Sequence, residues 1–340
     1  MRSIFSIPRK KLEEYFISIN EKKFKATQVF EWIYRKGVRS FDEMTNLSKD
    51  TISKLKEDFC FNEIKMVKKE EDELVKKYLF ELSDGNKIES VLMIHDYGLS
   101  VCISSQIGCN MGCAFCESGR LKKVRNLEVD EMLLQIMKIE EDIKERISHV
   151  VIMGIGEPFD NYENFTDFMD IVIDPYGLAI GQRHITVSTS GIVPKIKAFA
   201  DLESGVNLAI SLHAPNNKIR SSIMKVNNAY HIEEILDMVK YYISKTNRRV
   251  TFEYIMLDGV NDSKECAKEL ASLLKGINCY VNLIPYNETE NIEFKRSSTS
   301  QICEFYDILK KNNINVTIRK EFGSKVSAAC GQLRAKEMGE

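Results

Sequence analysis

The chain has 340 residues, of which 44% are apolar and 29% charged, and a formal net charge of −2. These values are ordinary for a soluble globular protein with one large domain and one smaller one. No apolar run approaches the roughly 18 residues of a transmembrane helix, and the N-terminus lacks the apolar segment and cleavage site of a secretory signal. We therefore expect a cytoplasmic protein that contacts no membrane and keeps its nine cysteines reduced.

Residues 1–65 are predicted to form a helical accessory domain. Apolar residues recur at helical spacing from Leu12 to Ile19, a second helical segment ends near Gly37, and Ser48 is a good N-cap for a third. The first 40 residues contain ten Lys or Arg against four Glu, interleaved with aromatic side chains. This composition indicates either an RNA-binding surface or, as charge alone favours, a solvated basic helix face.

The remainder of the chain is rich in predicted strands. Residues 66–98 are expected to form a β-hairpin extension that turns at Asp84-Gly85. Over residues 99–340, short Val/Ile-rich runs alternate with amphipathic helical segments, which is typical of buried parallel strands. The runs are residues 99–105, 149–156, 184–191, 207–213, 249–257 and 280–287. They predict an α/β fold, a partial (β/α)6 barrel, with its active site at the carboxyl ends of the strands.

Three cysteines, Cys109, Cys113 and Cys116, follow the first run of the predicted barrel in a C-x-x-x-C-x-x-C pattern. Three thiolates can bind three irons of a [4Fe–4S] cluster, which ordinarily has four cysteine ligands. The fourth iron is then open to a substrate or cofactor. This pattern resembles that of radical S-adenosylmethionine (AdoMet) enzymes, in which AdoMet binds the open iron and is cleaved to a radical. A zinc site with Cys102 as fourth ligand is the alternative.

Glycines and polar residues follow the later predicted strands, where a bound AdoMet would lie. Gly156 and Glu157 belong to a Gly-Ile-Gly-Glu-Pro segment, whose backbone could approach a ligand and whose carboxylate could accept a hydrogen bond from the amino group of AdoMet. The other candidates for AdoMet binding at the strand ends are Ser188, Ser211, Leu212, His213 and Asn287. Each alone is explained as a polar turn residue, but together they would form a ring of ligand size.

Motifs along nearly the whole chain resemble the RlmN/Cfr family of radical AdoMet methyltransferases, and the N-terminal module is closer to the RlmN branch. The motifs include KATQVFEWIYRKG, CISSQIGCNMGCAFC, Arg125-Asn126-Leu127, MGIGEP, SLHAPN and SAACGQLR. The resemblance implies methylation of C2 of an adenosine in 23S rRNA (adenosine 2503 in the family), with tRNA adenosine 37 as a second candidate. It also implies one [4Fe–4S] cluster, two AdoMet molecules per turnover, a flavodoxin- or ferredoxin-type electron donor and a monomeric enzyme.

The resemblance assigns roles to three further residues. Cys330 would carry a methyl group to the base, Cys102 would release the product through a transient disulfide with Cys330, and Glu89 would handle protons. Glu89 is equally explained as a solvated strand carboxylate. Two segments depart from the family pattern, Glu117–Gly119 and Ser324–Ser327, and leave a different RNA target open.

Three alternatives or minor expectations complete the sequence-based picture. Methylation of C8, the Cfr-type reaction that confers ribosomal antibiotic resistance, is the enzymatic alternative. A non-catalytic, metal-containing RNA-binding protein is the alternative of another class. The cysteines outside the motifs, which are Cys60, Cys266, Cys279 and Cys303, are predicted to be buried apolar residues.

Overall fold

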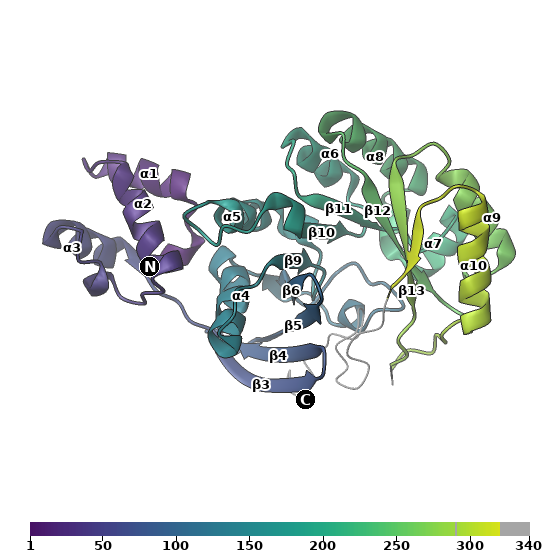
Figure 1. Cartoon of the computed structure of the whole chain (residues 1–340), viewed down its shortest axis with the longest axis horizontal. Coiled ribbons are helices and arrows are strands. Elements are labelled where there is room, and N and C mark those ends of the chain that lie inside the picture. The colour runs from purple at the N-terminus through teal and green to yellow at the C-terminus, as the bar shows by residue number, and fades with distance from the viewer. Residues whose placement is uncertain (290, 320–340) are drawn as a thin grey trace.

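The computed structural model describes residues 1–289 and 291–319 (Figure 1), so Cys330 and Ser324–Ser327 lie outside the described residues. In this part of the chain, ten strands form one sheet in the order β14-β13-β12-β11-β10-β9-β6-β5-β4-β3. Their bounds are β3 Lys65–Asp72, β4 Val75–Glu81, β5 Lys87–His95, β6 Gly98–Ile103, β9 His149–Ile152, β10 Ile185–Thr189, β11 Asn207–Ser211, β12 Val250–Met256, β13 Cys279–Pro285 and β14 Val316–Ile318.

Within this sheet, β6 and the strands β9 to β14 all run parallel, which confirms the predicted α/β fold. Each of the six Val/Ile-rich runs coincides with one of the strands β6 and β9–β13 to within one residue at its start. Their central side chains, such as Val187, Ile210 and Phe252, are fully buried because helices cover the outer face of the sheet. Figure 1 shows α6, α8, α9 and α10 along that outer face.

The helices of the described residues connect the strands and form the N-terminal module. Their bounds are α1 Arg9–Ser18, α2 Phe24–Phe30, α3 Lys49–Asp58, α4 Val129–Ile143, α5 Tyr162–Ile173, α6 Val193–Asp201, α7 Asn217–Ile223, α8 Ile232–Thr246, α9 Lys264–Leu273 and α10 Thr299–Lys311. Within residues 1–289 and 291–319, none of them combines the length and the apolar character needed to cross a bilayer.

The predicted hairpin is part of a longer antiparallel unit that continues the barrel sheet. Strands β4 and β5 pair around the expected turn, where the Asp84 carboxylate accepts a hydrogen bond from the Asn86 N–H at 3.0 Å. Strand β5 then pairs antiparallel with β6, the first barrel strand. The sequence did not predict β3, because its residues are mostly charged and it forms the edge of the sheet.

The N-terminal module contains the three predicted helices, and it lies at one end of the molecule beside α4 and α5 (Figure 1). Ser48 caps α3 as expected, because its hydroxyl accepts a hydrogen bond from the Thr51 N–H at 3.2 Å. Several basic side chains of the module bind acidic or carbonyl groups of the core. The contacts are Arg9 with Asp174, Lys11 with Asp167, Arg35 with the Pro175 carbonyl and Arg39 with Glu141. Part of the positive charge therefore serves docking of the module.

Candidate active site

A cavity lies at the carboxyl ends of the parallel strands and contains about 950 Å³ of empty space, part of it open to solvent. All three cysteines of the triplet line it, together with most of the residues predicted to bind AdoMet. The predicted residues in its wall are Cys109, Cys113, Cys116, Gly156, Glu157, Ser188, Ser211 and His213. The structure therefore brings together groups that lie more than one hundred positions apart in the chain.

The loop that carries the cysteines is closed at its base by two short strands. Strands β7 (Gln106–Ile107) and β8 (Arg125–Asn126) pair antiparallel. The N–H of Cys109 donates to the Leu121 carbonyl at 2.9 Å, and the N–H of Ala114 donates to the Ile223 carbonyl of α7, also at 2.9 Å. These bonds hold the loop over the strand ends, with the end of α7 as its support.

The three thiols share the cavity without surrounding one point, since no three His, Cys, Asp or Glu side chains among the described residues are placed to bind a single metal ion. Burial raises the pKa of Cys109 to about 12 and that of Cys113 well above its usual range, and the neighbouring thiolates add to both effects. Bound metal reverses this preference, because a coordinating thiol loses its proton. Three partly buried thiols that line one cavity are a suitable donor set for a [4Fe–4S] cluster that lacks a fourth cysteine.

The glycines of the Gly-Ile-Gly-Glu segment are required by packing inside the protein. A Cβ on Gly154 would lie 2.6 Å from the Ile103 carbonyl oxygen, and one on Gly156 would lie 2.6 Å from the Cβ of Gln106. Gly156 also has a φ of +111°, which other residues rarely adopt. The sequence predicted that these glycines let the backbone approach a ligand. In the structure they let it approach the end of β6 and β7.

Glu157 is buried and binds two backbone N–H groups. Its Oε1 accepts from the Phe159 N–H at 3.0 Å and its Oε2 from the Ser190 N–H at 2.7 Å. Burial raises the pKa of Glu157, and these hydrogen bonds oppose the rise. Each carboxylate oxygen has a second lone pair, so Glu157 can brace the loop and still accept a hydrogen bond from a ligand in the cavity.

The ends of β10 and β11 contribute hydroxyl and imidazole groups to the cavity. The Ser188 and Ser211 hydroxyl oxygens are 3.4 Å apart. The His213 Nδ1 accepts a hydrogen bond from the Ile255 N–H at 3.0 Å, so the proton of the neutral ring is on Nε2. Burial, helped by the charge of Arg220, lowers the pKa of His213 to about 3. His213 is therefore a neutral hydrogen-bond donor at physiological pH.

Two predicted ligands lie elsewhere. The Leu212 side chain is fully buried in the core, and its carbonyl accepts a hydrogen bond from Arg220 Nε at 3.1 Å. Asn287 lies two residues beyond the end of β13 and is absent from the described residues that line the cavity. In both cases, lying at a strand end did not place the side chain in the cavity wall. The orientation of a side chain also depends on how the following loop leaves the strand.

Glu89 and Cys102 lie on neighbouring strands next to the cavity and are not among its described lining residues. Glu89 is only 3% exposed and its Oε1 is 2.7 Å from the Nζ of Lys77, which is 7% exposed. The solvated carboxylate considered from the sequence is therefore wrong. Cys102 pairs in register with Val91 of β5 and packs with Ile155 of the Gly-Ile-Gly-Glu segment.

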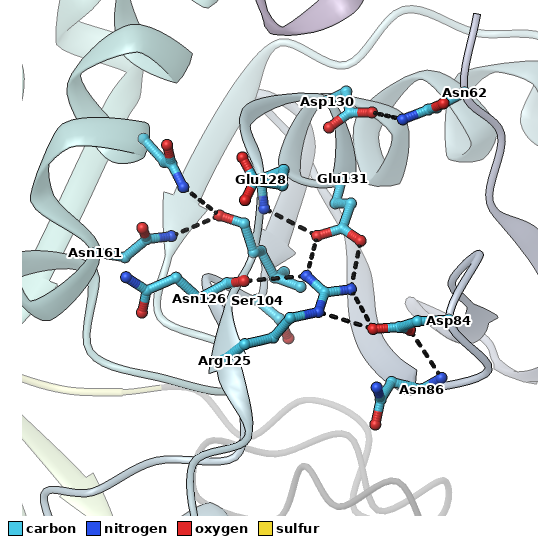
Figure 2. Close-up of polar contacts among 12 residues, drawn as sticks. Asn62, Asp84, Asn86, Ser104, Arg125, Asn126, Glu128, Asp130, Glu131 and Asn161 are labelled. Atoms are coloured by element: carbon cyan, nitrogen blue, oxygen red, sulfur yellow. Dashed lines mark hydrogen bonds and ion pairs between the residues drawn. The ribbon is translucent and has the colours of Figure 1, made fainter. Parts of the chain in front are cut away.

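Sequence reasoning missed the groups that hold the site together. Figure 2 shows Arg125 between two carboxylates: its Nη1 and Nη2 each donate to Glu131 at 2.7 Å, and its Nε donates to Asp84 at 2.8 Å. The Arg-Asn-Leu motif was the available signal. Lys77, Gln106, Arg220 and Glu253 are further missed residues, and Glu253 is a buried carboxylate in the cavity wall. Because Glu253 lies inside an apolar strand run, nothing in the sequence separates it from its neighbours.

The cysteines outside the motifs are only partly as predicted. Cys266 and Cys279 are buried, whereas Cys60 is partly exposed and Cys303 is exposed on α10. The prediction is wrong for Cys303, because α10 turns that position toward solvent.

Comparisons with known proteins agree with this architecture. The family model described as the ribosomal RNA large subunit methyltransferase N-terminal domain matches residues 3–61, and that of the radical SAM superfamily matches residues 103–274. Proteins named probable dual-specificity RNA methyltransferase RlmN are similar along their whole length. The relative from Enterococcus faecalis is 55% identical over 99% of this chain and 97% of its own, and the one from Spiroplasma citri is 52% identical over 100% and 99%.

A solved structure is similar over the same extent. The crystal structure of a radical SAM methyltransferase from Sphaerobacter thermophilus superposes with a TM-score of 0.91 and 39% sequence identity. It covers 99% of this chain, and this chain covers 100% of it. The similarity therefore includes the N-terminal module, the antiparallel strands and the barrel.

Proposed function

Because this chain belongs to the RlmN family of radical SAM methyltransferases, we propose that it methylates C2 of an adenosine in RNA. The proposed main substrate is adenosine 2503 of 23S ribosomal RNA, and adenosine 37 of tRNA is the second. The observation that carries the proposal is the cavity in which three thiols, Glu157 and the Ser188 and Ser211 hydroxyls meet at the strand ends. The dual-specificity RNA methyltransferase names of the full-length relatives support an RNA substrate.

In this proposal Cys109, Cys113 and Cys116 hold a [4Fe–4S] cluster, and the neighbouring groups bind AdoMet. When bound, the cluster would supply the electron that cleaves AdoMet to a 5′-deoxyadenosyl radical. Glu157 accepts from the amino group of AdoMet, while Ser188 and Ser211 bind its sugar or carboxylate. The Nε2–H of His213 adds a fixed donor. Burial of these groups excludes water, which protects a reactive species from side reactions.

Three further residues, Cys330, Cys102 and Glu89, divide the remaining steps. Cys330 carries the methyl group that becomes attached to the base, and Cys102 breaks the resulting link by forming a disulfide with Cys330. Two AdoMet molecules are used per turnover, one to methylate Cys330 and one to generate the radical. Glu89 is the proton acceptor, and the Lys77 ammonium at 2.7 Å orients its carboxylate.

The RNA must present an unstacked adenosine, because a base that remains stacked in a helix cannot enter an active site at the strand ends. We propose that the N-terminal module (residues 1–65) contacts the RNA backbone through exposed residues such as Lys22 and Lys23, beside the exposed Phe24. Binding should then weaken as salt rises. The proposed electron donor is of the flavodoxin or ferredoxin type, and the proposed enzyme is a monomer.

Nucleoside analysis tests the proposal. The protein, reconstituted anaerobically with iron and sulfide, is incubated with AdoMet, reductant and unmodified 23S rRNA fragment or tRNA, and the digested RNA is compared with 2-methyl- and 8-methyladenosine standards. We expect 2-methyladenosine. An 8-methyl product would contradict the C2 assignment, and cleavage of AdoMet without a methylated product would contradict the substrate.

Cysteine variants test the mechanism. Cys330→Ala should abolish methylation, and Cys102→Ala should accumulate a covalent protein–RNA adduct that resists denaturing electrophoresis. Cys303→Ala is the matched control, since this exposed cysteine on α10 should leave activity unchanged. Methylation by Cys330→Ala at the rate of the control would disprove the proposed methyl carrier.

A further inference from the structure

Arg220 on α7 is a fully buried arginine, with 0% of its surface exposed. A buried charge is costly unless an opposite charge or a metal site balances it. Among the described residues Arg220 forms no ion pair, and each of its hydrogen-bond acceptors is neutral. The acceptors are the carbonyl oxygens of Ser190, Ser211, Leu212 and Tyr230 and the side-chain oxygen of Asn227.

The hydrogen-bonding capacity of this guanidinium is fully used. An arginine has five N–H donors, and Arg220 makes five contacts, one from Nε and two from each terminal nitrogen. It therefore has no donor left for a substrate or for the carboxylate of AdoMet. What remains uncompensated is its positive charge.

The location of α7 indicates what this charge faces. The carbonyl of Ile223, three residues after Arg220, accepts the N–H of Ala114, which is adjacent to Cys113. Cys113 and Cys116 pack against Ile223 and Met224. Two of the carbonyl oxygens that Arg220 binds, those of Ser190 and Ser211, belong to residues that line the cavity together with the three cysteines. One helix thus holds a buried cation behind the cysteine loop.

We propose that Arg220 is a positioning residue that supplies the fixed positive charge balancing the cluster on Cys109, Cys113 and Cys116, and so makes that cluster easier to reduce. A cluster with three thiolate ligands is negative and gains further negative charge on reduction, so a nearby fixed cation stabilises the reduced form more. Net charge and hydrogen bonding are known determinants of cluster potential. Because Arg220 also binds the ends of β10 and β11, the same residue fixes the strand ends of the AdoMet site.

The test measures the midpoint potential of the reconstituted cluster without AdoMet or RNA, by reductive titration followed by visible absorption and electron paramagnetic resonance. Arg220→Gln and Arg220→Met remove the charge and should shift the potential to more negative values. Arg220→Lys keeps the charge and should remain near the wild type. Arg146→Gln is the control, because Arg146 also binds two carbonyl oxygens but lies before β9, at the opposite end of the strands.

The outcomes separate this inference from the proposed function on which it rests. A wild-type protein that cannot bind four irons contradicts the proposed function itself. Suppose that the wild-type protein binds four irons and that Arg220→Gln and Arg220→Met fold. If their cluster potential then equals that of the wild type and of Arg146→Gln, only the role of Arg220 is overturned. Arg220→Gln introduces a polar neutral side chain and Arg220→Met an apolar one, so the test remains decisive if one of the two variants does not fold. Circular dichroism of each apo variant shows whether it is folded.

Discussion

Arg125 and Arg220 support the same cysteine loop from two sides, but their charges are balanced differently. Arg125, at the base of the loop, is paired with the carboxylates of Asp84 and Glu131 (Figure 2). Arg220, behind the loop, contacts only neutral oxygens within residues 1–289 and 291–319. Arg125 is thus a self-contained structural clamp that joins the β4–β5 turn, β8 and the start of α4. For Arg220, the proposed balancing charge is that of the bound cluster.

The contrast between Arg125 and Arg220 shows that the presence or absence of a counter-ion helps to separate structural from functional charges. A cation that the fold itself neutralises explains stability, and its loss should be visible in the apo protein. A buried cation without a counter-ion points to a ligand, and its loss should be visible in the properties of that ligand. Lys77, paired with Glu89, adds a third case, because this pair is balanced yet contains a proposed catalytic group. Four stability measurements sharpen the comparison.

The largest effect is expected for Lys77→Met, which removes the ammonium group that lies 2.7 Å from the buried carboxylate of Glu89. Breaking a buried pair in this way should lower the free energy of unfolding by about 3 kcal/mol, measured by urea denaturation of the apo protein. The double variant Lys77→Met/Glu89→Leu should recover most of the loss, because an apolar pair needs no charge balance. A double variant no more stable than Lys77→Met would show that the charge imbalance is not the cause.

Arg125→Met should cost about 2 kcal/mol in the same measurement, because the pair with Glu131 is more exposed than that of Lys77 and Glu89. Arg125→Lys keeps the charge but cannot bind Glu131 with two parallel hydrogen bonds, so it should recover part of the loss. Full recovery by lysine would mean that charge alone, without the planar geometry, forms the clamp.

Asp84 makes the clamp pH-dependent. Although burial opposes it, hydrogen bonds from Asn86 and Arg125 lower the pKa of Asp84. A carboxyl group whose pKa is lower in the folded state stabilises the protein above its unfolded pKa, and that stabilisation is lost as the pH falls through the folded pKa. Asp84→Asn should therefore cost about 1 kcal/mol at pH 7, given the partial exposure, and the difference from the wild type should shrink below about pH 4. A difference that stays constant down to pH 3 would exclude this linkage.

The smallest effect is expected for Arg146→Gln, less than about 0.5 kcal/mol, since exposed side chains away from buried networks contribute little. Its two carbonyl acceptors can bind water instead. A larger loss, measured by the same denaturation, would show that arginine–carbonyl contacts alone stabilise this fold, and would weaken the contrast between Arg125 and Arg220.

Local patterns predicted the fold well in segments where apolar residues recur at a regular spacing or form a short continuous run. The three N-terminal helices have apolar residues at helical spacing, and the six barrel strands are short Val/Ile-rich runs whose central residues are buried. Strand β3 was missed because KMVKKEED has neither feature. That segment becomes a strand through pairing with β4, which is a tertiary contact.

The site was predicted in part, for a comparable reason. Cys109, Cys113 and Cys116 are recognisable because their spacing is typical of cluster ligands, and Glu157 because its loop is short and rich in glycine. Leu212 and Asn287 were selected by position alone, and the structure places the Leu212 side chain in the core and Asn287 outside the described cavity wall. The roles of Cys102, Glu89 and Cys330 stay predictions.

The sequence by itself determined the alternation of strands and helices, the cysteine loop after the first barrel strand and the family of the chain, because these depend on residue order and spacing. Tertiary structure decided which charges are balanced. Nothing in the run NKIRSSI distinguishes Arg220 from a solvated helix residue, and nothing in KIESV shows that Glu89 meets Lys77. Both outcomes arise because burial and the partners of a charge depend on segments brought together from distant parts of the chain, which no local pattern records.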